Sequence, residues 1–170
     1  MNGAADPLIV TLRCNGPRWS FCIQQRELHF PPERNLVPAH IALFHHLPGE
    51  ALEQILADVE AARIPSFEFQ VSGVRSLGRG VAYVVDSPPL TALREELAGK
   101  WRPWLTPQDC SKYSPHITIQ NKVEPQQARE LLQALQSDFS PFPLKSPGLE
   151  IWHYRGGPWE PAGYVPFLVS

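Results

Sequence analysis

Two histidines of this 170-residue chain stand in similar short segments, Pro-Ala-His-Ile-Ala around His40 and Ser-Pro-His-Ile-Thr around His116. Histidine exchanges protons near neutral pH, so one imidazole can take a proton while a second one gives a proton. A hydroxyl two residues after a histidine, as in Thr118, shares its strand face and can donate to a phosphoryl oxygen. We therefore predict metal-independent acid–base chemistry on a phosphodiester, with His40 and His116 as the catalytic pair.

The segment from Ser114 to Lys122 alternates as a strand with two different faces. Ile117 and Ile119 supply an apolar face that belongs to a core. The opposite face carries an imidazole, a hydroxyl, an amide and an ammonium, from His116, Thr118, Gln120 and Lys122. A core does not need such a row, but an anion site can use it. We predict that Thr118, Gln120 and Lys122 contact the substrate.

A second copy of this segment lies at 38–46, displaced by 76 residues, the offset from His40 to His116. The same offset carries the apolar positions of the following helix onto one another without a gap, so strand and helix recur together. His46 corresponds to Lys122, and we predict that it also contacts the substrate. By strand alternation, His45 lies on the same face as the core residues, and we expect it to form a hydrogen bond in the core.

Apolar spacing places these histidines within a regular order of elements. The chain predicts helices at 17–29, 49–63, 88–101 and 125–138, a loop at 106–113, and strands at 7–13, 36–47, 66–71, 81–86, 114–122 and 148–155. The order β-α-β-α-β occurs twice and predicts a duplicated α+β fold with two mostly antiparallel sheets that face a central cleft and carry helices outside. We expect one two-lobed domain over 1–170, with halves at 7–75 and 80–155 and a closing strand at 162–169.

Composition restricts the partners of the chain. A formal net charge of −2 gives no overall positive field, so we expect no duplex DNA partner and only local contact with RNA. Three cysteines without paired spacing predict neither a disulfide framework nor a zinc site, and we expect free thiols in the cytoplasm. Neither a signal peptide nor a membrane-spanning apolar run is visible in the sequence. We expect the protein to be a monomer.

The two motifs resemble those of the two-histidine phosphoesterases, which include 2′-5′ RNA ligases and cyclic nucleotide phosphodiesterases. That family has two His-x-Thr/Ser motifs, one in each half of a duplicated α+β fold. Segments at 29–35, 120–123 and 156–161 also look like a bacterial branch of the family. The resemblance implies an enzyme without a cofactor that acts on a 2′,3′-cyclic phosphate or a 2′-5′ linkage, in an RNA 3′ end or a small cyclic nucleotide.

Ala42 departs from this pattern, because the family has Thr or Ser at that position. Either the activity is lower, the substrate differs, or His45 or His46 replaces the hydroxyl. An alternative is therefore a nucleotide-binding or RNA-end-binding module with weakened catalysis. A third interpretation is a structural protein whose histidine faces pack against a partner. Arg75 and Arg79, in a loop between strands, are further candidates for substrate contact.

Overall fold

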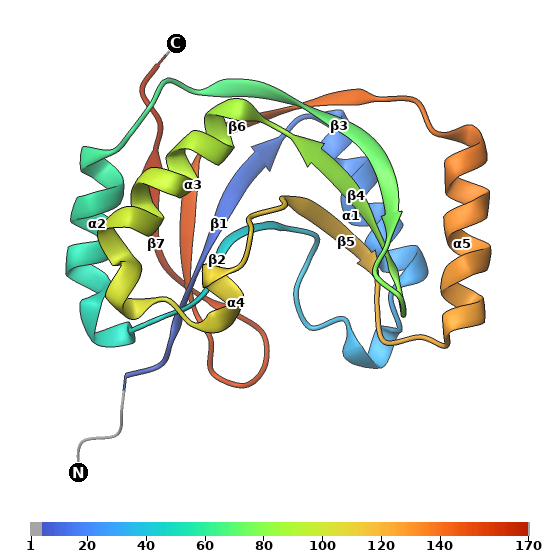
Figure 1. Cartoon of the computed structure of the whole chain (residues 1–170), viewed down its shortest axis with the longest axis horizontal. Coiled ribbons are helices and arrows are strands. Elements are labelled where there is room, and N and C mark those ends of the chain that lie inside the picture. Colours follow the sequence, from blue (N-terminus) through green and yellow to red (C-terminus); the bar gives the residue numbers. More distant parts are fainter. Residues whose placement is uncertain (1–4, 170) are drawn as a thin grey trace.

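The computed structural model describes residues 5–169 of the chain. Seven strands form one hydrogen-bonded sheet in the order β2-β1-β6-β3-β4-β5, with β7 paired to β6 (Figure 1). All pairs of these strands are antiparallel. The strands are β1 Leu8–Asn15, β2 Ile41–Leu47, β3 Phe67–Ser76, β4 Val81–Asp86, β5 His116–Gln120, β6 Phe142–His153 and β7 Glu160–Pro166. The α-helices are α1 Pro17–His29, α2 Leu52–Ala61, α3 Pro88–Trp101, α4 Pro107–Cys110 and α5 Pro125–Asp138.

The strand order has the symmetry that the sequence repeat predicts. Strands β2, β1 and β6 on one side of the centre correspond to β5, β4 and β3 on the other. At the centre, Phe69 of β3 pairs with Leu144 of β6. The third strand of each half therefore joins the first two strands of the other half. This arrangement confirms the duplicated α+β fold.

The two predicted sheets are joined into one, which corrects the expectation of separate sheets. The long strand β6 pairs with β3 near its beginning and with β1 and β7 further along. The sequence pattern predicts only the second part of this strand, because Pro143 and Pro147 lack the N–H group of a regular strand residue. The predicted loop at 106–113 contains the short helix α4, and the strand predicted from residue 36 begins only at Ile41.

Helices cover the outer side of each part of the sheet (Figure 1). Helix α1 packs against β5, and helix α5 packs against β3 and β4; the core side chains Ile117 and Ile119 are fully buried. Behind β2, the ring of Trp101 in α3 lies 5.0 Å from the ring of Phe44, and its Nε1 donates to Asp58 at 2.8 Å. The edge strands β2 and β5 are thereby fixed from behind. No helix within residues 5–169 is long and apolar enough to cross a membrane.

Candidate active site

A β-bulge in each edge strand decides which side chains face the site. The register shifts between Ala42 and Phe44 in the β1–β2 ladder, and between Thr118 and Gln120 in the β4–β5 ladder. One extra residue reverses the alternation of side chains beyond it. Phe44 and Gln120 are therefore turned to the core, where their exposed fractions are 0% and 2%. The polar face predicted from strict alternation ends at Ala42 and Thr118.

The two histidine rings are held in the same way. Nδ1 of His40 lies 2.9 Å from the carbonyl oxygen of Pro38, and Nδ1 of His116 lies 2.8 Å from that of Ser114. A carbonyl oxygen can only accept, so Nδ1 of each ring carries the proton and donates it. This leaves Nε2 of each ring for a substrate, as a proton acceptor when neutral and as a donor when protonated.

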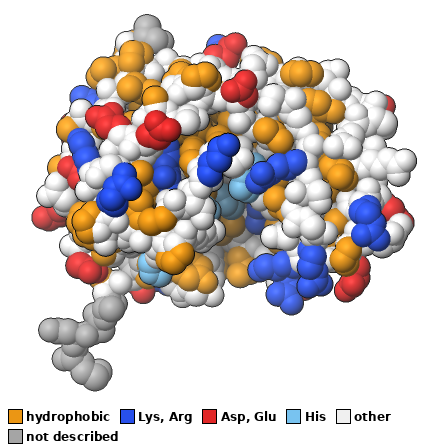
Figure 2. Space-filling model, viewed as in Figure 1, with side chains coloured by type: hydrophobic (Ala, Val, Ile, Leu, Met, Phe, Trp, Pro, Cys, Tyr) orange, Lys and Arg blue, Asp and Glu red, His pale blue; other side chains and the backbone are white. Residues whose placement is uncertain are grey.

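His40 and His116 line one cavity of about 280 Å³ between the two edge strands. Figure 2 shows histidine side chains in a hollow of this face, with Lys and Arg side chains around its rim. Thr118 also lines the cavity, so the structure brings together the two histidines and the hydroxyl of the second motif. The other lining residues are Ala42, Leu43, His45, Arg75, Arg94, Gln108, Asp109, Ser111, Lys112, Tyr113 and Ser114.

Burial keeps both catalytic candidates neutral in the free protein. It is the main cause that lowers the pKa of His40 from 6.5 to about 4, and the charge of Arg26 lowers it further. The ring of Trp159 covers His40, with 4.6 Å between ring centroids. Burial also lowers the pKa of His116 below its usual range, and the guanidinium of Arg75 adds to the effect. An anion between the rings would favour the protonated forms, because it supplies the opposite charge.

Three predicted substrate contacts do not line this cavity. Gln120 is buried, and its Oε1 has no hydrogen-bond partner. Lys122 lies beyond the end of β5, exposed and with a φ of 64°. His46 is exposed outside the cavity, while His45 lines it. The prediction for Gln120 and His46 rested on uninterrupted strand alternation, which the bulges interrupt. The expected hydrogen bond of His45 is confirmed, with Asp109 as its partner, but the side chain lines the cavity instead of the core.

Asp109 is a site residue that the sequence did not indicate. Its Oδ1 lies 2.9 Å from Nδ1 of His45, and its carboxylate accepts from the backbone amides of His45 and His46 at 2.9 to 3.2 Å. Burial alone would raise the pKa of Asp109, but these hydrogen bonds outweigh it, and the pKa is lowered. Thr106, which caps the first turn of α4, and Pro107 in that turn are local signals for this helix.

Two buried arginines fix the edge strands from behind. Nη1 of Arg26 in α1 donates to the carbonyl oxygen of Thr118 at 3.0 Å. Nε of Arg94 in α3 donates to the carbonyl oxygen of Leu43 at 2.9 Å. Burial lowers the pKa of Arg26 to about 10, so its guanidinium keeps its charge at neutral pH. Each motif strand is thus held by a helix from the opposite half of the chain.

Arg75 is placed to hold an anion. Its Nη2 lies 3.4 Å from Nδ1 of His116, but both atoms carry protons, so they cannot bond to each other. Its Nη1 lies 3.4 Å from Oγ of Ser114, and its Nε is buried without a hydrogen-bond partner. A guanidinium with unused donors beside His116 suits a phosphoryl oxygen. Arg79, the other candidate, bonds the carbonyl oxygen of Val123 and does not line the cavity.

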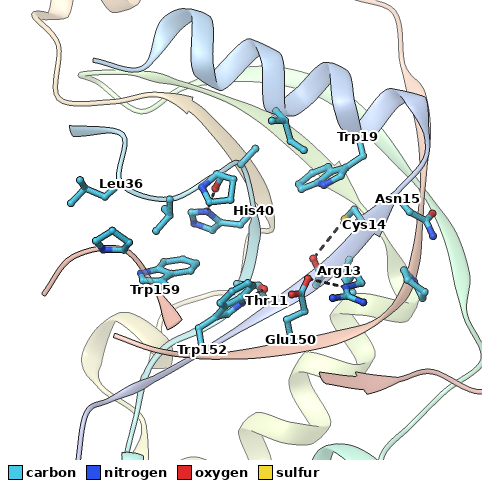
Figure 3. A pocket seen from close by; sticks show the side chains of 17 residues that line it. Thr11, Arg13, Cys14, Asn15, Trp19, Leu36, His40, Glu150, Trp152 and Trp159 are labelled. Carbon is cyan, nitrogen blue, oxygen red and sulfur yellow. Dashed lines mark hydrogen bonds and ion pairs between the residues drawn. The ribbon is translucent and has the colours of Figure 1, made fainter. Parts of the chain in front are cut away.

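A second cavity of about 550 Å³ lies beside His40, which lines both (Figure 3). Three tryptophans, Trp19, Trp152 and Trp159, line it together with aliphatic and polar side chains. Trp152 donates from Nε1 to Oγ1 of Thr11 at 2.9 Å, so this ring is fixed by a hydrogen bond. The cavity therefore offers flat aromatic surfaces next to His40.

No group of three or more His, Cys, Asp or Glu side chains within the described residues is arranged to hold a metal ion. The side chains that meet in the smaller cavity are instead imidazoles, guanidinium groups and hydroxyls. That set can transfer protons and bind an anion.

Comparisons with known proteins identify the family from the sequence and the fold from solved structures. Residues 15–158 match the 2′-5′ RNA ligase superfamily. No curated protein sequence matches the chain significantly. Among solved structures, TT0787 of Thermus thermophilus is 14% identical with a TM-score of 0.67, over 95% of this chain and 97% of that one. E. coli LigT complexed with 3′-AMP is 18% identical with a TM-score of 0.64, over 95% and 98%. Kluyveromyces marxianus Usb1 is 12% identical with a TM-score of 0.51, over 94% and 99%.

Proposed function

Because the chain belongs to the 2′-5′ RNA ligase superfamily, we propose that it acts on a 2′,3′-cyclic phosphate or a 2′-5′ phosphodiester of an RNA end or a small nucleotide. Membership of the superfamily supports an enzyme of the phosphoesterase or ligase type. The observation that carries the finer proposal is the single cavity that His40 and His116 both line, with equivalent ring orientations.

In the hydrolytic direction, one imidazole acts as base and the other as acid. Neutral His40 takes a proton through Nε2 from a water molecule, whose oxygen attacks phosphorus. Protonated His116 gives its Nε2 proton to the ribose oxygen as the bond from phosphorus to that oxygen breaks. We assign the base to His40 because burial lowers its pKa further than that of His116, so His116 is the ring that the bound phosphate protonates more readily. The reverse reaction exchanges the two roles and forms the ester bond.

Charge that develops on the phosphoryl oxygens needs donors fixed in advance. Oγ of Thr118, the guanidinium of Arg75 and the ammonium of Lys112 line the cavity and can supply them. The Lys and Arg side chains at its rim suit an RNA end despite the net charge of −2. The complex of LigT with 3′-AMP supports a nucleotide as substrate.

The three tryptophans in the cavity beside His40 support a substrate that carries a base. Stacking of a base on an aromatic side chain contributes about 1–3 kcal/mol per base. We further propose that the protein works as a monomer in the cytoplasm. Cys14, Cys22 and Cys110 are free cysteines, of which Cys14 and Cys22 are buried.

The test is turnover of 2′,3′-cyclic AMP by chelator-treated protein, with the products identified by chromatography. The proposal expects a single 2′- or 3′-monophosphate. It also expects losses of about 10²–10⁴ in kcat/KM for His40→Ala and for His116→Ala. Protein that is inert with chelator and restored by a divalent metal ion would contradict the mechanism. A 2′-5′-linked dinucleotide, assayed in the same way, distinguishes the two substrate classes.

A second candidate is a binding module for nucleotides or RNA ends. Ala42 favours it, because the first half lacks the hydroxyl of the second motif. Under this alternative the wild-type protein binds 2′,3′-cyclic AMP but does not turn it over, and His116→Ala weakens binding. Ala42→Thr, which restores the hydroxyl, would then restore turnover.

A further inference from the structure

The strand β2 places a third imidazole in the cavity. A second shift in the β1–β2 register, between Val10 and Leu8, spans the segment that contains His45. The side chain of His45 is 41% exposed and lines the same cavity as His40 and His116. By the offset of 76 residues, His45 corresponds to Asn121, which does not line the cavity. The two halves therefore differ at this position.

Asp109 holds the ring of His45 in one orientation. Its side chain is 1% exposed, and its two oxygens accept from Nδ1 of His45 and from the amides of His45 and His46. A carboxylate can only accept, so Nδ1 carries the proton of that bond and Nε2 is left for the cavity. Arg94 fixes Asp109 in turn, because its Nη2 donates to the carbonyl oxygen of Asp109 at 2.6 Å.

The first half lacks a donor that the second half has. His116 is followed by Thr118, whose side chain lines the cavity, whereas His40 is followed by Ala42, which has no hydroxyl. Of the side chains that β2 contributes to the cavity wall, from Ala42, Leu43 and His45, the imidazole of His45 is the one that can donate a hydrogen bond. Its protonated form would be balanced by the Asp109 carboxylate.

We propose that His45, oriented by Asp109, binds a phosphoryl oxygen of the substrate in the first half, where the second half uses Thr118. Nε2 of the protonated His45 ring is the donor to the oxygen, because Nδ1 already gives its proton to Asp109. Asp109 is a positioning residue that does not touch the substrate. The proposal rests on the proposed function, since it takes the phosphodiester to lie between His40 and His116. It also accounts for how the site keeps donors on both sides although position 42 is Ala.

The experiment compares wild type with four variants by kcat/KM on 2′,3′-cyclic AMP and by thermal unfolding. We expect His45→Ala to lower kcat/KM about 10²–10³-fold while the protein remains folded at the assay temperature. His46 is the neighbouring exposed histidine and lies outside the cavity. The kcat/KM of His46→Ala should therefore stay within about twofold of wild type. Ala42→Thr should recover most of the loss in the His45→Ala background. Asp109→Asn should cause little further loss in that background, because a positioning residue acts only through His45.

A kcat/KM for His45→Ala within about twofold of wild type would overturn the proposal. So would a failure of Ala42→Thr to recover activity in the His45→Ala background. Asp109 is buried. If Asp109→Asn unfolds the protein, the variants at positions 42, 45 and 46 still decide the question. If the wild type turns over neither substrate, inorganic phosphate titrated into the protein is followed by the proton resonances of the histidine rings. A shift of the His45 signal would then support its role while the proposed function fails, and an unmoved His45 signal would refute it.

Discussion

His40 should stabilise the folded protein only while its imidazole is neutral. Its pKa is about 4 in the folded state, chiefly because of burial, and 6.5 is the ordinary value that the unfolded chain should have. Between these values the unfolded chain binds more protons than the folded one, so the free energy of unfolding rises with pH. The contribution of His40 is fully present above pH 6.5 and is lost as the pH falls toward 4.

The difference between the two pKa values corresponds to about 3 kcal/mol, since one pKa unit is worth roughly 1.4 kcal/mol. About 2–3 kcal/mol of this should be lost between pH 7.5 and pH 4.5, since the folded state begins to take up the proton itself near pH 4. His40→Gln removes the titrating group but keeps a polar side chain of similar length. Its free energy of unfolding should therefore fall less on acidification than that of wild type, by about that amount.

Urea denaturation at several pH values between 4.5 and 7.5 measures both proteins. His116 also has a lowered pKa and contributes acid sensitivity of the same sign, but it is present in both proteins and cancels in the difference. If the free energy of unfolding depends on pH in the same way for wild type and His40→Gln, the account of a desolvated His40 is refuted. A steeper fall for the variant would reverse the sign of the shift and refute it as well.

Three further changes test the site and the sheet. Thr118→Val should lower kcat/KM on 2′,3′-cyclic AMP by about 10²–10³ with an unchanged circular dichroism spectrum, and an effect below threefold would remove Thr118 from the site. Trp159→Ala should uncover His40 and move the acid limb of the pH profile of kcat/KM from near 4 toward 6.5; an unmoved limb would mean that this ring does not desolvate His40. Gly80→Ala should destabilise the protein by about 2 kcal/mol or more in urea denaturation, because its Cβ would collide with the backbone carbonyl oxygen of Gln120.

The sequence predicted the elements whose signals are local. Helices α1, α3 and α5 have the predicted bounds, because each begins with a proline that is tolerated in the first turn. The repeat at an offset of 76 residues was visible in the same way, and with it the pairing of His40 and His116.

Two kinds of feature could not be predicted from the sequence: those set by a one-residue shift in strand register, and those set by contacts between residues far apart in the chain. The bulges at 43–44 and 119–120 leave the apolar pattern nearly unchanged, yet they turn Phe44 and Gln120 to the core and allow His45 to line the cavity. Asp109 reaches His45 across 64 residues of chain, and Arg26 reaches Thr118 across 92. The exchange of β3 and β6 between halves likewise follows from long-range pairing, which no local pattern encodes.

The central claim is that His40 and His116 act on one phosphate. Inorganic phosphate titrated into chelator-treated protein, with each ring followed by its Hε1 proton resonance and assigned through His40→Gln and His116→Gln, tests it most directly. The account predicts that both resonances shift along one binding curve with a single Kd, and that either variant weakens the shift at the remaining histidine. Two curves with different Kd values, or a shift at one histidine only, would contradict a shared site.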